Sequence, residues 1–194
     1  MGDLIEFHNI FDNTIESQDI TTLHNAMFTM LDEVDAENSA VVFDVKCLTR
    51  PYTNNVDTKG MTLYSEVVAR GVAPYFFSWE VDTPANLAAE TARLTALGVA
   101  DPIILLRDTS ECNTPKKNLG WNASIASYTR RRAATYGLTR TIVMYVGRKW
   151  VDVLPENILA TSLPSTDTEH HLLCRHKESG VWCLRMSPSK IMQS

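Results

Sequence analysis

Long apolar runs are missing from this chain of 194 residues: no stretch approaches the roughly 18 apolar residues that a membrane-spanning helix needs. Residues 1–9 do not combine a basic start with an apolar run, as a secretory signal does. Basic residues are not in excess either, because 18 Lys and Arg face 23 Asp and Glu and leave a net charge of −5. We therefore expect a soluble, cytoplasmic protein that binds neither membranes nor nucleic acid.

Cysteine is also scarce and scattered. Cys47, Cys112, Cys174 and Cys183 form no C-x-x-C pair, so neither a zinc ribbon nor a dithiol redox motif is indicated. Without a secretion signal, we expect free thiols in place of disulfides. No internal repeat or low-complexity tract divides the chain, and its apolar content of 44% suits a globular core. We expect a single domain over residues 1–194.

Short apolar strands alternate with helical patterns along the chain. Strands are expected at residues 40–45, 72–77, 102–106, 141–146 and 181–186, and helices at residues 18–34, 62–70, 83–97 and 124–135. This alternation predicts right-handed βαβ units in a Rossmann-like, three-layer α/β/α sandwich with a mostly parallel central sheet. The core would span about residues 38–155, between an N-terminal helical segment, 1–37, and a C-terminal extension, 156–194, that carries an edge strand.

Polar residues stand where three of the predicted strands end. Asp44 and Lys46 end the first strand, Ser78 follows the second, and Arg148 and Asp152 follow the strand at residues 141–146. Ligand sites of open parallel sheets form at such carboxyl ends. Ser78 could hydrogen-bond a phosphate oxygen, Lys46 and Arg148 could neutralise an anion, and Asp152 could bind a metal. The pattern alone leaves two alternatives open, a phosphate site and ordinary polar residues at strand ends.

Four segments, in this order, resemble the haloacid-dehalogenase-like (HAD) superfamily, and within it the class B-type acid phosphatases related to plant vegetative storage proteins. Residues 41–46 resemble the nucleophile strand, and residues 71–78 resemble the strand whose terminal Ser or Thr binds phosphate. Residues 128–132 resemble the start of a helix that carries a lysine after the tyrosine. Residues 146–152 resemble a Gly-Asp-x-Trp-x-Asp metal loop and retain its tryptophan as Trp150. The resemblance implies a HAD-like fold, a Mg²⁺ cofactor and hydrolysis of phosphoric monoesters.

The same resemblance places substitutions on functional positions. In the family, one aspartate attacks phosphorus, a second aspartate two residues later acts as acid and base, and Mg²⁺ relieves the charge repulsion. Asp44 matches the nucleophile, but Lys46 stands at the acid/base position and Arg148 where a Mg²⁺ ligand is expected. Thr129 replaces the lysine. Only Asp44 and Asp152 would remain to hold Mg²⁺, which prefers several oxygen ligands, so we expect no bound cofactor.

Two functions are compatible with these substitutions. The favoured one is a pseudophosphatase, a binding or structural protein that takes a phosphate-bearing small molecule or anion through Ser78, Lys46 and Arg148, or that pairs with a protein partner such as a second copy of itself. The alternative is a weak, metal-independent phosphomonoester hydrolase in which Asp44 is the nucleophile. The first is favoured because a lysine that is normally protonated at pH 7 is a poor base for the dephosphorylation step.

Overall fold

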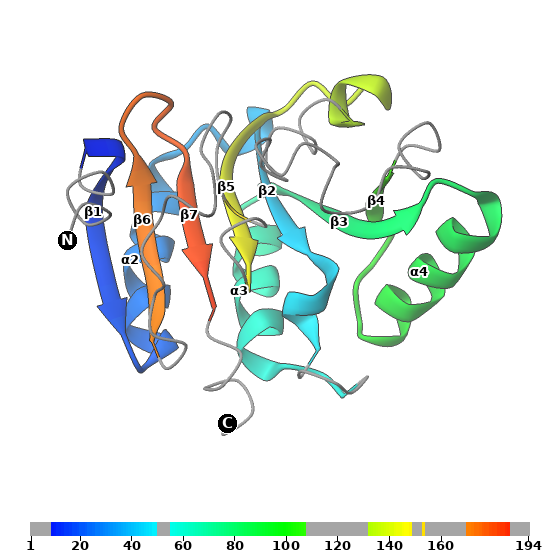
Figure 1. Cartoon of the computed structure of the whole chain (residues 1–194), viewed down its shortest axis with the longest axis horizontal. Coiled ribbons are helices and arrows are strands. Elements are labelled where there is room, and N and C mark those ends of the chain that lie inside the picture. The colour runs from blue at the N-terminus through cyan, green and yellow to red at the C-terminus, as the bar shows by residue number, and fades with distance from the viewer. Residues whose placement is uncertain (1–8, 50–54, 108–131, 149–152, 154–169, 187–194) are drawn as a thin grey trace.

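A computed structural model describes residues 9–49, 55–107, 132–148, 153 and 170–186 of the chain. Its seven strands form one sheet in the order β1-β6-β7-β5-β2-β3-β4 (Figure 1). The strands are β1 (Phe11–Ser17), β2 (Ser39–Asp44), β3 (Ala73–Val81), β4 (Ile103–Arg107), β5 (Thr141–Gly147), β6 (His171–His176) and β7 (Trp182–Arg185). Only the pairs that include β6 are antiparallel among these strands. The predicted mixed α/β fold with a mostly parallel sheet is confirmed.

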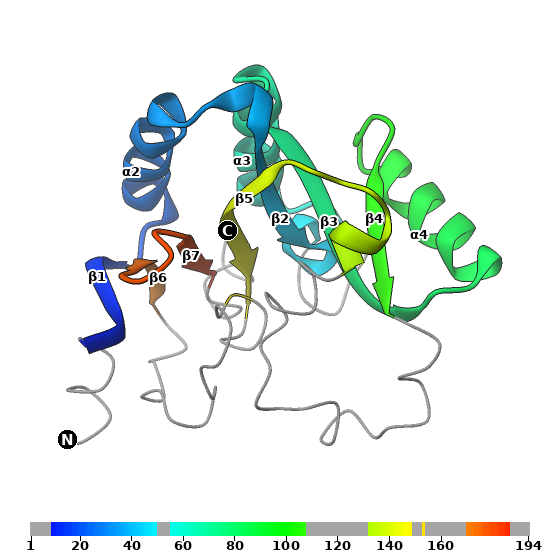
Figure 2. The ribbon, with the colours of Figure 1, turned by 90° about the horizontal axis from the view of Figure 1, so that it is seen from above.

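Three helices lie along one side of this sheet, as Figure 2 shows: α2 (Ile20–Glu33), α3 (Thr58–Ala69) and α4 (Pro84–Ala96). Each begins after a polar residue whose side chain accepts a hydrogen bond from the first helical turn: Asp19, Asp57 and Thr83. Such caps satisfy backbone N–H groups that have no partner within the helix. The cap at Asp57 explains why α3 begins at Thr58, four residues before the position that the sequence pattern predicts.

Alternate residues of each strand point to opposite sides of the sheet. Side chains are buried on both of these faces. On the helical face, residues such as Val41 and Phe76 pack with side chains of α2, α3 and α4. On the other face, residues such as Val42 and Tyr145 pack with Ala133 and Val153. Ala133 belongs to the helix expected at residues 124–135, which is described only from residue 132 onward. The three-layer, HAD-like arrangement therefore stays a prediction.

The two ends of the chain differ from the sequence prediction. Residues 1–37, expected to be helical, contain the strand β1 before α2 begins, and the final strand, β7, lies inside the sheet, not at its edge. Two strands, β1 and β6, lie beyond β7, and neither is among the predicted strands. In β6, His171 lies fully buried although histidine is often exposed. In β1, Asn13 adopts a positive φ of 48° near the irregularity in the pairing with β6.

Arg132 ties the helical residues 132–135 to β4. Its Nε donates a hydrogen bond to the carbonyl of Leu106 at 2.9 Å, and its Nη2 contacts Asp82 and the hydroxyl of Tyr136. We expect Arg132→Met to lower the free energy of unfolding by about 2 kcal/mol, because Arg132 is buried and its partners lose charge-assisted bonds. Urea unfolding at pH 7 measures this loss.

The matched control is Arg175→Met, which removes the more exposed ion pair between Arg175 and Asp12. Exposed pairs contribute little, so we expect this variant to unfold at nearly the same urea concentration as the wild-type protein. Equal losses of unfolding free energy in the two variants would contradict the stabilising role of the buried hydrogen bonds of Arg132.

Candidate functional site

The structure places Asp44 and Arg148 at the carboxyl ends of two neighbouring strands, β2 and β5, whereas Ser78 lies inside the next strand, β3, which continues to Val81 and does not end at residue 77 as predicted. Asp44 lies beside Phe77 in the register of β2 and β3, and Phe43 lies beside Val146 in the register of β2 and β5. The chain runs outward from β2 to β3 and β4, and then returns to β5 on the other side of β2. Such a switch point is where open α/β sheets form their ligand crevices.

Asp44 is held by the backbone that follows it. The short 3-10 helix η2 (Val45–Leu48) begins directly after β2, and the carboxylate Oδ1 of Asp44 accepts a hydrogen bond from the N–H of Lys46 at 3.1 Å. Asp44 is buried, whereas the side chain of Lys46 is exposed. The backbone of Lys46 therefore orients the carboxylate, and its ammonium group extends toward solvent.

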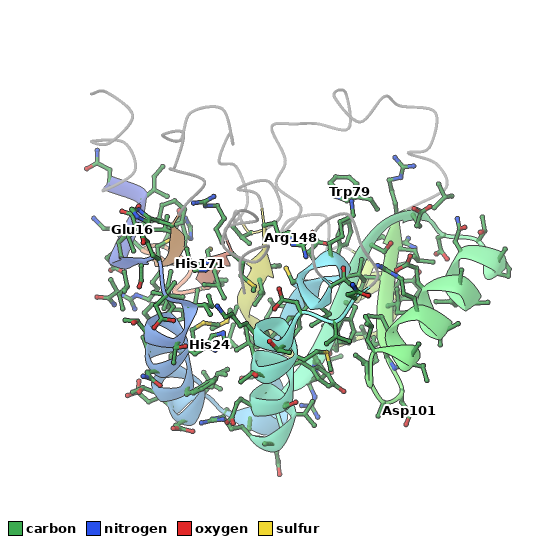
Figure 3. All side chains as sticks on the ribbon, turned by 90° about the horizontal axis from the view of Figure 1, so that it is seen from below. Glu16, His24, Trp79, Asp101, Arg148 and His171 are labelled. Carbon is green, nitrogen blue, oxygen red and sulfur yellow. The ribbon has the colours of Figure 1, made fainter. Side chains whose placement is uncertain are left out.

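Arg148 crosses from the end of β5 to the segment that follows η2. Its Nη2 donates a hydrogen bond to the carbonyl oxygen of Thr49, which forms an isolated bridge with Val56 (Figure 3 labels Arg148). Its Nε is buried and has no hydrogen-bond partner among the residues that the structure describes. Because a buried donor without an acceptor is costly, this guanidinium can take an anionic ligand.

Ser78 is buried within β3, one residue after the Phe77 that lies beside Asp44, and its Oγ accepts a hydrogen bond from the N–H of Glu80 at 3.2 Å. This bond uses a lone pair of the oxygen and leaves the hydroxyl proton for a phosphate oxygen. Asp152 and Trp150 of the predicted metal loop lie outside the described residues, as does Thr129. The placement of Ser78 is thus compatible with the predicted role, and that of Asp152 is not tested.

Sequence reasoning missed two buried histidines on the helical side of this edge. His24 of α2 and His171 of β6 lie near one another in Figure 3, each at most 5% exposed. Burial, together with the charges of Lys59 and Arg185, lowers the pKa of His171 to about 4. Burial also lowers the pKa of His24. Both imidazoles are therefore neutral at pH 7. No sequence signal marked them, because burial depends on how α2 packs on β6.

Arg185 is a third residue that the sequence pattern does not identify. It ends β7, lies beside Gly147 of β5, and is only 5% exposed. Its Nη2 donates a hydrogen bond to the carbonyl of His170 at 2.9 Å. The strand ends considered from the sequence omitted this one, because the last strand was expected at the edge of the sheet. Had β7 been placed next to β5, Arg185 would have joined the predicted site.

Among the residues that the structure describes, no three His, Cys, Asp or Glu side chains are grouped so that they could hold a metal ion. No described helix is long and apolar enough to cross a membrane. Cys47, Cys174 and Cys183 are buried cysteines in the thiol form. A scan against models of protein families finds no match for this chain, and a search of curated proteins finds none.

Proposed function

We propose that this chain is a catalytically degenerate HAD-like phosphatase homologue, a pseudophosphatase, that binds a phosphate-bearing anion without metal-dependent turnover. The binding site lies at the carboxyl ends of β2, β3 and β5. The observation that carries this proposal is the set of charges around Asp44. This buried carboxylate ends β2 beside the switch point, while the residue two positions later, Lys46, and the residue after β5, Arg148, are cations.

These charges favour an anion over a divalent cation. Positive side chains at the two positions where the family has carboxylates disfavour Mg²⁺, which requires carboxylates and water around it. They attract a phosphate group, to which guanidinium groups donate paired hydrogen bonds. The buried Nε of Arg148 and the hydroxyl of Ser78 supply donors for such a group. Without a base to activate water, binding would not lead to rapid hydrolysis.

Calorimetry with MgCl₂ and with inorganic phosphate tests both halves of this proposal. We expect phosphate to bind and Mg²⁺ not to bind measurably, and an aryl phosphate not to be hydrolysed faster when Mg²⁺ is added. Robust Mg²⁺-stimulated hydrolysis that Asp44→Asn abolishes would refute the proposal.

One observation favours residual chemistry: the N–H of Lys46 fixes the carboxylate of Asp44 in place, as a nucleophile requires. A weak, metal-independent phosphomonoester hydrolase remains the second candidate. This function requires the carboxylate of Asp44 to take the phosphoryl group from an aryl phosphate, with release of the phenol, in the presence of EDTA. Mass spectrometry after incubation with an aryl phosphate detects this adduct, and its absence would exclude Asp44 as an active nucleophile toward that donor.

The double variant Lys46→Asp and Arg148→Asp is expected to bind Mg²⁺ at least about tenfold more tightly than the parent, a gain of about 1.4 kcal/mol. The reason is that two carboxylates would replace two cations beside Asp44. Lys46→Asp alone is expected to gain little, since Arg148 would remain. Calorimetry with MgCl₂ measures the difference.

The control for this experiment makes the same change in net charge away from the sheet edge, with Arg175→Asp and Lys177→Asp. A similar gain in Mg²⁺ affinity in the control would mean that net charge, and not a rebuilt site, attracts the ion.

A further inference from the structure

Two of the buried cysteines face one another across neighbouring strands. Cys174 of β6 and Cys183 of β7 are directly opposite in the antiparallel register of these strands. Both side chains belong to the core cluster on the face of the sheet opposite the three helices, and they are 0% and 1% exposed. Cys47 belongs to the cluster on the helical face. The fold therefore brings two thiols together and keeps Cys47 apart from them.

The spacing of this pair fits a disulfide. The N–H of His176 donates a hydrogen bond to the carbonyl of Val181 at 2.8 Å. Hydrogen-bonded pairs recur at every second position of an antiparallel ladder, so Cys174 and Cys183 form a pair of the same type. The Cα atoms of such a pair lie about 5.5 Å apart, which is within the range of roughly 4.4–6.8 Å that disulfides span.

The Cβ atoms of facing residues are usually about 4.5–5.5 Å apart, whereas a disulfide brings them to about 3.8 Å. A bond between Cys174 and Cys183 would therefore draw β6 and β7 slightly together. Such a bond is more easily reduced than one in relaxed geometry. The pair is thus suited to a disulfide that forms and breaks, and less suited to a permanent cross-link.

The two side chains already interact in the thiol form. The Sγ of Cys174 donates a hydrogen bond to the carbonyl oxygen of Cys183 at 3.9 Å. Burial, together with a hydrogen bond to the Cys183 side chain, raises the pKa of the Cys174 thiol. The side chain of Cys174 therefore lies toward Cys183, and its sulfur is protonated at neutral pH.

We propose that Cys174 and Cys183 are a redox-sensitive pair, which a small disulfide such as oxidised glutathione converts into a reversible disulfide between β6 and β7. One cysteine, as its thiolate, attacks a sulfur of the oxidant and releases one glutathione. The second cysteine then attacks the protein sulfur of this mixed disulfide and releases the other glutathione. The protein loses two S–H bonds and gains one S–S bond, and the two released thiolates take up the two protons. This inference does not depend on the proposed function.

The disulfide would join two parts of the sheet. Among the described strands, β1 and β6 connect to the others through the pairing of β6 with β7. A covalent bond at this pairing prevents β6 from separating from β7 by local opening. The burial of both cysteines also makes oxidation slow while the sheet is closed, because exchange requires an accessible thiolate. We therefore expect oxidation when β6 moves away from β7, or during folding.

Peptide mapping of the full-length protein tests this proposal. The protein is incubated with oxidised and reduced glutathione at mildly alkaline pH, the remaining thiols are alkylated, and the chain is digested with trypsin. Trypsin cleaves after Arg175 and Lys177, so a disulfide between Cys174 and Cys183 holds two peptides together. We expect this linked pair in the wild-type protein, with alkylation lost at both cysteines together. Urea below the unfolding transition should accelerate its formation, and an excess of reduced glutathione should reverse it.

Cys47→Ser is the matched control and should leave the linked pair unchanged, whereas Cys183→Ser should abolish it. Refolding of the wild-type protein from urea in the same glutathione mixture is a second measurement, which requires neither opening of the native sheet nor a folded variant. Glutathione attached to Cys174 or Cys183 without the linked pair, or linkage of either cysteine to Cys47, would overturn the proposal. Absence of the linked pair both in the native protein and after refolding would overturn it as well. Because no phosphate is present, these outcomes leave the proposed function untouched.

Discussion

Replacing Gly60 with alanine is expected to lower the free energy of unfolding by about 3 kcal/mol or more. A Cβ atom at this position would lie 2.0 Å from the carbonyl oxygen of Cys47 and 3.0 Å from its carbon. Both are backbone atoms of η2, so no side-chain rotation can relieve the clash. Either α3 or η2 must move.

The movement would also disturb the candidate site. The N–H of Gly60 donates a hydrogen bond to the Oδ1 of Asp57 at 3.0 Å, so displacing the first turn of α3 breaks its cap. On the other side, η2 carries the Lys46 N–H that orients Asp44. We therefore expect Gly60→Ala to lose phosphate binding together with stability.

Gly180→Ala is the control for this substitution. Gly180 has a φ of +71°, but no atom lies within 4 Å of an added Cβ. Its cost is the strain of a left-handed alanine, about 1 kcal/mol. Urea unfolding of both variants at pH 7 separates steric overlap from backbone strain. If Gly60→Ala lowers the free energy of unfolding no more than Gly180→Ala does, η2 can shift at little cost. The close contact between Gly60 and η2 would then not be important for stability.

Gly60 illustrates what sequence patterns do and do not predict. Asparagine, proline and glycine between residues 51 and 60 are typical of a loop, and the sequence pattern predicts the helix only from residue 62. In the structure Asp57 caps a helix that already includes Gly60. The glycine is needed there for close packing against η2, not for a turn. Such tertiary packing has no local signal in one sequence.

The same distinction applies to the candidate site. Strands β2, β3 and β5 are rich in β-branched and aromatic residues, so the polar residues that follow these apolar runs, Asp44, Ser78 and Arg148, could be found from the sequence, although β3 continues past Ser78 to Val81. Arg185 ends an equally recognisable strand. It was missed because the order of strands in a sheet depends on long-range pairing, which places β7 beside β5. Sequence patterns identify strand ends, whereas the structure decides which of them are neighbours.

Acidification is expected to destabilise the protein mainly through His171. Its pKa is about 4 in the folded protein, because it is fully buried and faces Lys59 of α3, Arg185 of β7 and His24 of α2, with Asp19 opposing them. The ordinary value of 6.5 applies to the unfolded chain. Between these values the unfolded chain binds the proton more tightly, so stability falls as the pH drops below 6.5 and levels off near 4. The full loss is about 3 kcal/mol.

Chemical unfolding at a series of pH values between 7 and 4 measures this loss, and His171→Leu should remove most of it. His24 should contribute in the same direction, since burial lowers its pKa as well. His170→Gln is the control, because this neighbouring histidine is only partly buried and pairs with Glu16.

The two carboxylates whose pKa values are lowered, Asp12 and Asp19, cannot produce the same profile. Hydrogen bonds from Arg175 to Asp12 and from Thr21 to Asp19 hold the pKa of each carboxyl below its usual 3.8, so their stabilisation is lost only at lower pH. A loss that begins below pH 6.5 and survives in His171→Leu would therefore assign the acid sensitivity to another group. A loss that disappears with His171 would show that the contact between α2 and β6, beside the candidate anion site, depends on a neutral imidazole.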